Sequence, residues 1–191
     1  MRSILLGVCC AFFASQAGAQ TVPPNEQLVQ NQSLLWLNVK GGQFQSLLLD
    51  SFDAPVQMEM ELTLESVNAH AQWAPGASVC VVGKASDVET CIRIAGYGNG
   101  STDAYVFKAL HSDKDGRKTL MTRDPVPGQF KIGSKIRIAL RSGPDSVEFK
   151  VDDGAWLMQA LPFTPQALRL ICSSALCKLR LNDKDSTPPG A

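Results

Sequence analysis

The sequence predicts an all-β protein, an antiparallel β-sandwich of about ten to twelve short strands. From Leu34 onward, apolar residues recur at every second position, which is the spacing of a strand with one buried face. Turn-forming pairs such as Asn99-Gly100 and Asp153-Gly154 separate these runs. No segment carries the spacing of a convincing amphipathic helix. These observations together favour a sandwich over any helical class.

The strands can be assigned in order along the chain. Strand-like runs cover residues 34–39, 46–52, 56–65, 78–83, 91–96, 104–110, 136–140, 147–151, 168–173 and 177–182. A further strand follows the Asp153-Gly154 turn. The run 56–65 alternates apolar residues with Glu59, Glu61 and Glu65, so it predicts a strand with one apolar and one acidic face. Trp36 lies in LLWLNV, which is apolar on both sides, and we expect its side chain in the core.

The N-terminus predicts a secretory signal peptide over residues 1–19. Arg2 precedes an apolar segment, Ile4–Phe13, and the small residues Ala17-Gly18-Ala19 follow that segment. That segment has about ten residues, well short of the ~20 that a membrane-spanning helix needs, and we expect no transmembrane segment. The remaining chain divides into a flexible segment 20–32, a β-sandwich domain 33–182 and a flexible tail 183–191. The predicted location is secreted or periplasmic.

Four cysteines remain after the two in the signal peptide: Cys80, Cys91, Cys172 and Cys177. In an oxidising compartment an even number of cysteines indicates disulfides. Each of the pairs Cys80–Cys91 and Cys172–Cys177 flanks a turn of polar or small residues between two apolar runs, so we expect these two bonds. A zinc site is disfavoured because its paired ligands usually lie closer in sequence than Cys80 and Cys91 do.

The charge balance argues against a nucleic-acid partner. The chain has 18 basic and 18 acidic residues and a formal net charge of zero. A nucleic-acid-binding domain usually carries a strong basic excess on one face. We therefore expect no nucleic-acid partner for this chain.

The C-terminal third carries a family resemblance. The hairpin VEFKVDDG, followed by LPF at residues 161–163, resembles the closing strands of concanavalin A-like (laminin G and lectin/glucanase) jelly rolls, over roughly residues 135–181. FDAPVQMEMELTLE resembles an earlier strand of the same superfamily. This resemblance implies a jelly-roll sandwich.

A second, weaker resemblance is to the invasion-associated locus B family. Its members combine a V-D-x-G and L-P-F segment with two spaced cysteine pairs, the later one C-x4-C, which is the spacing of Cys172 and Cys177. This chain departs from that pattern because TPQALRLI separates LPF from Cys172.

The acidic strand raises the question of catalysis. Retaining glycosidases of the laminarinase type place carboxylates at alternate positions of one strand, where two carboxyl groups about 5 Å apart do the chemistry. Here Glu61 occupies the aspartate position, and Glu65 would stand about 13 Å from it at ~3.3 Å per residue. That separation does not suit a retaining pair. We interpret these residues as a solvated strand face, and keep a divergent hydrolase using Glu59 and Glu61 as an alternative.

Aromatic residues in loops are the candidates for ligand binding, since the apolar face of a sugar stacks on an exposed ring. The predicted ligand-binding residues are Trp73, Tyr97, Asn99 and Asp103, with Tyr105 and Trp156 as further aromatic candidates. Asp113 and Asp115 would supply a calcium loop, but the other ligands of such a loop are missing, and a hairpin turn explains them better. We predict no metal and no cofactor.

The sequence therefore favours a secreted, non-catalytic β-sandwich protein that binds glycans or envelope components. A divergent glycoside hydrolase is one alternative. A structural or host-interaction protein, which would bind another envelope or extracellular protein, is the other.

Overall fold

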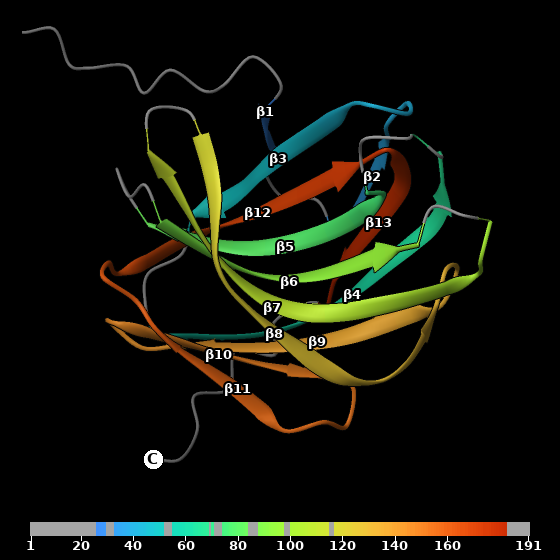
Figure 1. The fold of residues 1–191 in the computed structure, drawn as a ribbon. Coiled ribbons are helices and arrows are strands. Elements are labelled where there is room, and N and C mark those ends of the chain that lie inside the picture. Colours follow the sequence, from blue (N-terminus) through green and yellow to red (C-terminus); the bar gives the residue numbers. More distant parts are fainter. Residues whose placement is uncertain are drawn as a thin grey trace, which may run out of the picture.

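The computed structural model describes residues 26–29, 33–51, 55–68, 70, 74–83, 88–97, 100–114 and 117–182. These residues form thirteen strands in two sheets, which stack as the layers of a sandwich (Figure 1). The described part of the chain contains no helix long and apolar enough to cross a membrane. The predicted all-β sandwich class is confirmed, with thirteen strands where about ten to twelve were expected. The predicted signal peptide and C-terminal tail lie outside the described residues.

The two sheets interleave segments that are far apart in sequence. The seven-stranded sheet has the order β1 (Glu26–Val29), β3 (Phe44–Ser51), β12 (Pro165–Ser173), β5 (Gly76–Gly83), β6 (Val88–Gly96), β7 (Asp103–Lys114) and β8 (Arg117–Lys131). The six-stranded sheet has the order β11 (Trp156–Ala160), β10 (Ser146–Val151), β9 (Lys135–Ser142), β4 (Val56–Val67), β13 (Ala175–Leu181) and β2 (Leu34–Asn38). Every described strand pair is antiparallel except β1 with β3.

The core lies between the sheets and is built from the apolar positions of the alternating runs. Met60 and Leu62 of β4 are fully buried, as are Ile138 of β9 and Phe149 of β10. Ile92 and Ile94 of β6 and Leu170 of β12 close the core from the other sheet. Because successive strand residues point to opposite faces, each strand sends every second side chain into this layer.

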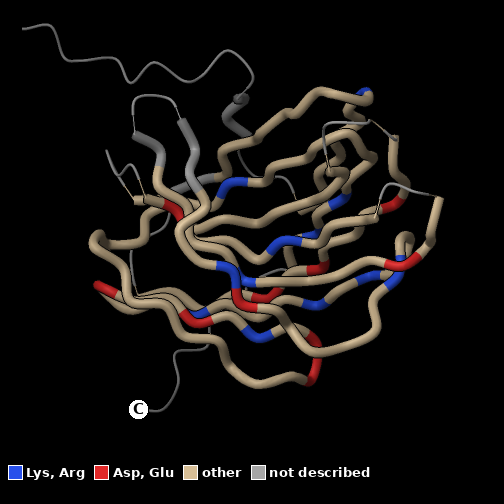
Figure 2. Tube along the Cα trace, in the orientation of Figure 1, with Lys and Arg blue, Asp and Glu red and all other residues tan. Residues whose placement is uncertain are grey.

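The glutamates of β4 point away from the core, as the alternating pattern predicts. Glu61 Oε2 lies 3.4 Å from Lys135 Nζ, and Glu65 Oε1 lies 3.8 Å from Lys178 Nζ. Acidic and basic positions are intermixed over the six-stranded sheet (Figure 2). This face is therefore a surface of cross-strand ion pairs.

The expectation that Trp36 belongs to the core is wrong. Its side chain is 50% exposed, whereas Leu35 and Leu37 on either side are buried. The period of two explains the difference, because an apolar residue at every position still sends alternate side chains outward. On the outer face Lys178 Nζ lies 4.5 Å from the centre of the Trp36 ring. This contact covers one side of the ring.

Two strands were not expected from the sequence. β1 lies within residues 20–32, to which no strand was assigned, and it pairs in parallel with β3. β8 contains Pro125, Pro127 and Gly128, which interrupt the alternating pattern of a strand. The structure accommodates both prolines because β8 is the edge strand of its sheet, where a missing N–H donor leaves no ladder position unpaired.

Both expected disulfides are present. Cys80 and Cys91 lie directly opposite each other on β5 and β6, on the face turned away from the other sheet. Cys172 and Cys177 join β12 to β13, so their bond links the two sheets of the sandwich. Ser174, between them, adopts a φ of 46° and donates its backbone N–H to the carbonyl oxygen of Gln43.

Lys108 connects the two sheets at one side of the sandwich. It lies on β7 and is buried, with its Nζ 3.1 Å from Asp124 Oδ2 of β8. The same Nζ donates to the carbonyl oxygen of Met158 on β11, the edge strand of the other sheet, at 2.8 Å. A buried ammonium with two oxygen partners therefore connects the edges of the two sheets.

Candidate functional site

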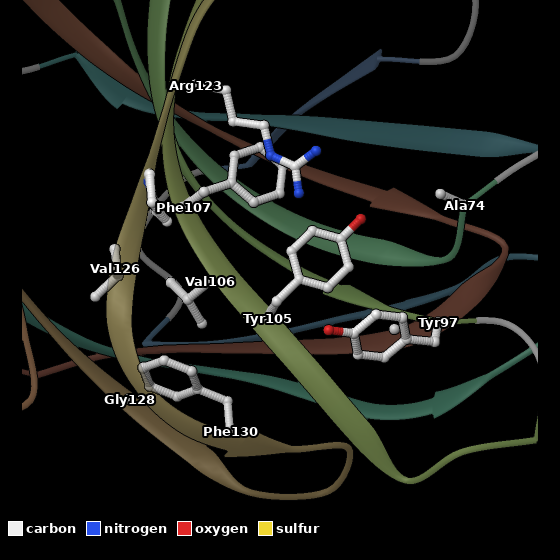
Figure 3. A pocket seen from close by; sticks show the side chains of 11 residues that line it. Ala74, Tyr97, Tyr105, Val106, Phe107, Arg123, Val126, Gly128 and Phe130 are labelled. Carbon is white, nitrogen blue, oxygen red and sulfur yellow. The ribbon is translucent and has the colours of Figure 1, made fainter.

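The candidate site is a groove where β7 and β8 separate at the edge of the seven-stranded sheet. It has a volume of about 480 Å³, within the range of small-ligand sites. Figure 3 shows the side chains that line it. The lining residues are Ala74, Gly96, Tyr97, Tyr105, Val106, Phe107, Arg123, Pro125, Val126, Gly128 and Phe130.

A bulge in β8 opens this groove. Ala104 and Val106 of β7 pair with Phe130 and Val126 of β8, so β8 has extra residues between its two pairing positions. The bulge includes Gly128, whose φ is 151°. A Cβ on Gly128 would lie 2.7 Å from the Phe130 ring, so glycine is required for this close approach. Beyond the bulge β8 continues toward the six-stranded sheet and leads into β9 (Figure 1).

Three aromatic rings form a row along the groove. The rings of Tyr97 and Tyr105 have centres 5.2 Å apart, and those of Tyr105 and Phe107 are 5.6 Å apart. Phe107 is 7% exposed and forms the floor, whereas Tyr97 is 58% exposed at the open end. The spacing of Tyr105 and Phe107 follows from the strand period, which puts alternate residues of β7 on the same face. This row presents an apolar surface that becomes more accessible toward Tyr97.

Arg123 covers the inner part of the row. Its guanidinium carbon lies 4.3 Å from the centre of the Phe107 ring and 4.8 Å from the centre of the Tyr105 ring. In Figure 3 the Tyr105 hydroxyl points toward this guanidinium. A planar cation stacked on aromatic faces keeps its in-plane N–H groups available for other acceptors. The groove therefore combines an apolar surface with hydrogen-bond donors.

A second arginine lies on the same sheet face. Arg93 is opposite Phe107 in the strand register, is half-buried, and its Nη2 lies 3.4 Å from the carbonyl oxygen of Ala74. Burial lowers the pKa of the Arg93 guanidinium from its ordinary value, and the nearby charge of Arg123 lowers it further, while Tyr105 raises it. The two cations are thus close enough to repel each other at the groove.

The predicted ligand-binding residues are placed as follows. Tyr97 lines the groove. Asp103 is exposed near the start of β7, and its backbone N–H donates to Ser101 Oγ at 3.0 Å, but it does not line the groove. Trp73 and Asn99 lie outside the described residues, although Ala74, which follows Trp73 in the chain, is part of the lining.

Sequence reasoning missed Phe107, Arg93 and Arg123 as site residues. Phe107 alternates with Tyr105 in AYVFKAL, so the strand period alone could have grouped the two rings. Arg93 interrupts the apolar run CIRIAG at a position that faces away from the core. No local pattern indicated Arg123, because Pro125 and Pro127 interrupt the alternation of β8 and the strand was not predicted.

The other sequence candidates lie elsewhere. Glu59 and Glu61 are on the outer face of the six-stranded sheet, as is Trp156, whose ring lies 4.1 Å from the guanidinium carbon of Arg141. Among the described residues, one group of metal-ligand types occurs, Cys80, Glu89 and Cys91. Its two sulfurs form a disulfide and offer no thiolate to a metal. Asp115 of the calcium hypothesis lies outside the described residues.

No protein-family model and no curated protein matches the chain. Solved structures do resemble it. A carbohydrate-binding module, CBM66 from Bacillus subtilis, has a TM-score of 0.47 and 11% identity, and the match covers 80% of this chain and 96% of that one. Galectin-Ib from Xenopus laevis has a TM-score of 0.47 and 13% identity, over 73% of this chain and 100% of that one.

A glycoside hydrolase family 16 endo-glucanase from Bacteroides ovatus has a TM-score of 0.49 and 12% identity, over 78% of this chain and 80% of that one. The resemblance of the C-terminal sequence to concanavalin A-like jelly rolls stays a prediction beyond the sandwich architecture itself. At these identities the likeness concerns the fold and does not transfer a ligand or an activity. The resemblance to the locus B family stays a prediction.

Proposed function

We propose that the protein is a non-catalytic glycan-binding protein and that its binding site is the groove between β7 and β8. The observation that carries this proposal is the row of rings that ends at Tyr97, which lies 58% exposed at the mouth of a groove. A sugar presents an apolar face of C–H groups and a rim of hydroxyls. The exposed ring of Tyr97 can stack on the apolar face of the sugar. The guanidinium of Arg123 and the hydroxyl of Tyr105 can form hydrogen bonds with the sugar hydroxyls.

The arrangement of carboxylates supports a non-catalytic role. The lining of the groove, as far as the chain is described, includes no acidic side chain, and a glycosidase needs two. The acids of β4 lie on the opposite sheet, where Glu61 pairs with Lys135 and Glu65 with Lys178. We expect a panel of fluorogenic glycosides to give no turnover that depends on Glu61. Turnover abolished by Glu61→Gln would contradict the non-catalytic role.

Two disulfides support a location outside the cytoplasm, because such bonds persist in oxidising compartments. We propose that the chain is secreted or periplasmic after removal of residues 1–19, and that residues 33–182 form its one domain. Mass spectrometry of the exported protein, with Gln20 expected as its first residue, tests this division.

Binding to immobilised glycans tests the function. We expect Tyr97→Ala to weaken retention on the best glycan by about tenfold or more, because stacking of this kind contributes on the order of 1 kcal/mol or more per ring. The melting temperature should move by only a few degrees, since the ring is mostly exposed. Trp156→Ala is the matched control, an aromatic residue stacked with an arginine on the other sheet. If Trp156→Ala abolishes binding and Tyr97→Ala does not, the glycan site lies on the six-stranded sheet and the proposed groove is not the binding site.

A further inference from the structure

Two arginines lie at or beside the groove: Arg123 lines it, and Arg93 lies opposite the lining residue Phe107 in the strand register. Ion pairs join Lys108 to Asp124, Lys135 to Glu61, Arg137 to Asp153, Arg141 to Glu148, Arg169 to Glu89 and Lys178 to Glu65. Arg93 and Arg123 have no acidic partner among the described residues. They lie on the same sheet face, and the charge of Arg123 adds to the larger effect of burial in lowering the pKa of the Arg93 guanidinium.

Arg123 is held in place before any ligand arrives. Stacking on Phe107 and Tyr105 restricts its side chain, so less conformational entropy remains to be lost on binding. The stacked face uses the π side of the guanidinium and leaves its N–H edges free. Such an edge matches the two oxygens of a carboxylate or sulfate in a bidentate contact, which is stronger than a contact to a neutral hydroxyl.

The position of the charge relative to the exposed ring selects the ligand. The Tyr105 ring separates Arg123 from Tyr97, with the guanidinium carbon 4.8 Å from its centre on one side and the Tyr97 ring centre 5.2 Å away on the other. A sugar stacked on Tyr97 can therefore extend a charged substituent toward Arg123. The net charge of the chain is zero, so the anion is recognised locally and not by a general basic surface.

We propose that the groove binds an anionic saccharide, with the sugar face on Tyr97 and a carboxylate or sulfate on the N–H edge of Arg123. Arg93 supports the anion electrostatically from β6. This assignment rests on the proposed glycan-binding function and names the ligand class for the same site. An anion at this point offsets the repulsion between the charges of the two arginines.

Calorimetric titration of the whole chain with defined probes tests the assignment. The probes are short oligogalacturonides and sulfated galactose oligosaccharides, each compared with its neutral counterpart after carboxyl reduction or desulfation. We expect at least one anionic probe to bind about tenfold or more tightly than its neutral form, as for a charged hydrogen-bonded pair. Whether the carboxylated or the sulfated probe shows this preference identifies which anion the groove takes.

Variants connect the preference to the residues. Arg123→Gln should weaken binding of the anionic probe by about tenfold or more and binding of the neutral form by clearly less, so that the preference is lost. Arg123→Lys should restore only part of it, because an ammonium keeps the charge but loses the bidentate edge. Arg141→Gln is the matched control, since Arg141 also stacks on an aromatic ring but is paired with Glu148, and it should not change the preference.

The outcomes separate this assignment from the glycan-binding proposal. Equal affinity for charged and neutral probes, with loss of both in Tyr97→Ala, overturns the assignment and supports glycan binding. An anionic preference that survives Arg123→Gln also overturns it. If Tyr97→Ala does not affect binding of the anionic probes and inorganic polyphosphate binds equally well, charge attraction alone explains the binding, and both proposals are overturned. Both are also overturned if the protein binds none of the probes and no immobilised glycan.

Discussion

Within the part of the chain that the structure describes, an arginine stacks on aromatic rings in two places, once on each sheet. On the six-stranded sheet Arg141 lies over Trp156 and also pairs with Glu148 on the neighbouring strand. On the seven-stranded sheet Arg123 lies over Phe107 and Tyr105 and has no acidic partner among the described residues.

The difference lies in how the charge is compensated. At Arg141 the carboxylate of Glu148 compensates the positive charge, so no ligand is needed there. At Arg123 no described carboxylate compensates the charge, and the guanidinium lies beside an exposed ring in a groove. The same stacked cation can therefore serve surface structure in one place and recognition in the other.

Truncating the ring beneath each arginine should give the largest contrast. Phe107 is 7% exposed, and Phe107→Ala should lower the free energy of unfolding by about 3 kcal/mol because it leaves a cavity in the floor of the groove. Trp156 is only partly buried, and Trp156→Ala should cost about 1 kcal/mol. Urea unfolding measures both. Similar losses for the two variants would mean that the rings play the same structural part.

The bulge that opens the groove gives an intermediate effect. Gly128→Ala should cost about 2 kcal/mol, because its Cβ would meet the Phe130 ring at 2.7 Å with φ at 151°. It should also weaken glycan binding, since Phe130 must shift within the lining.

Gly133→Ala is the control for backbone strain. Its φ is 87° and nothing lies within 4 Å of the added Cβ, so we expect a cost of about 1 kcal/mol and unchanged binding. Equal binding by the two glycine variants would show that the bulge does not shape the site.

The smallest effects should come from neutralising the arginines. Arg141→Gln breaks a half-exposed ion pair and should destabilise by up to about 1 kcal/mol. Arg123→Gln loses its stacking on Phe107 and Tyr105 but also removes repulsion with Arg93, so we expect a change within about 0.5 kcal/mol in either direction. Thermal unfolding at low salt compares them. A larger loss for Arg123→Gln would mean that this cation is primarily structural.

The sequence by itself determined the class of fold, the facing of several strands and the favoured disulfide pairing. The period of two over β4, β9 and β10 specified which side chains enter the core, because a strand alternates its faces whatever its neighbours are. It also specified that Glu59, Glu61 and Glu65 point outward. Of the three possible connectivities of four cysteines, the sequence favoured the observed one, Cys80 with Cys91 and Cys172 with Cys177, because each pair flanks a turn between two apolar runs.

Only the tertiary structure decided the site. β8 was hidden because Pro125 and Pro127 are acceptable in a strand only at a sheet edge, and edge position is a property of the whole sheet. Trp36 was misassigned because local apolarity does not say which strand face meets the other sheet. Arg93, Phe107 and Arg123 come from three strands, and the register of β6, β7 and β8 brings them together. Register is a long-range pairing that no local pattern of residues contains.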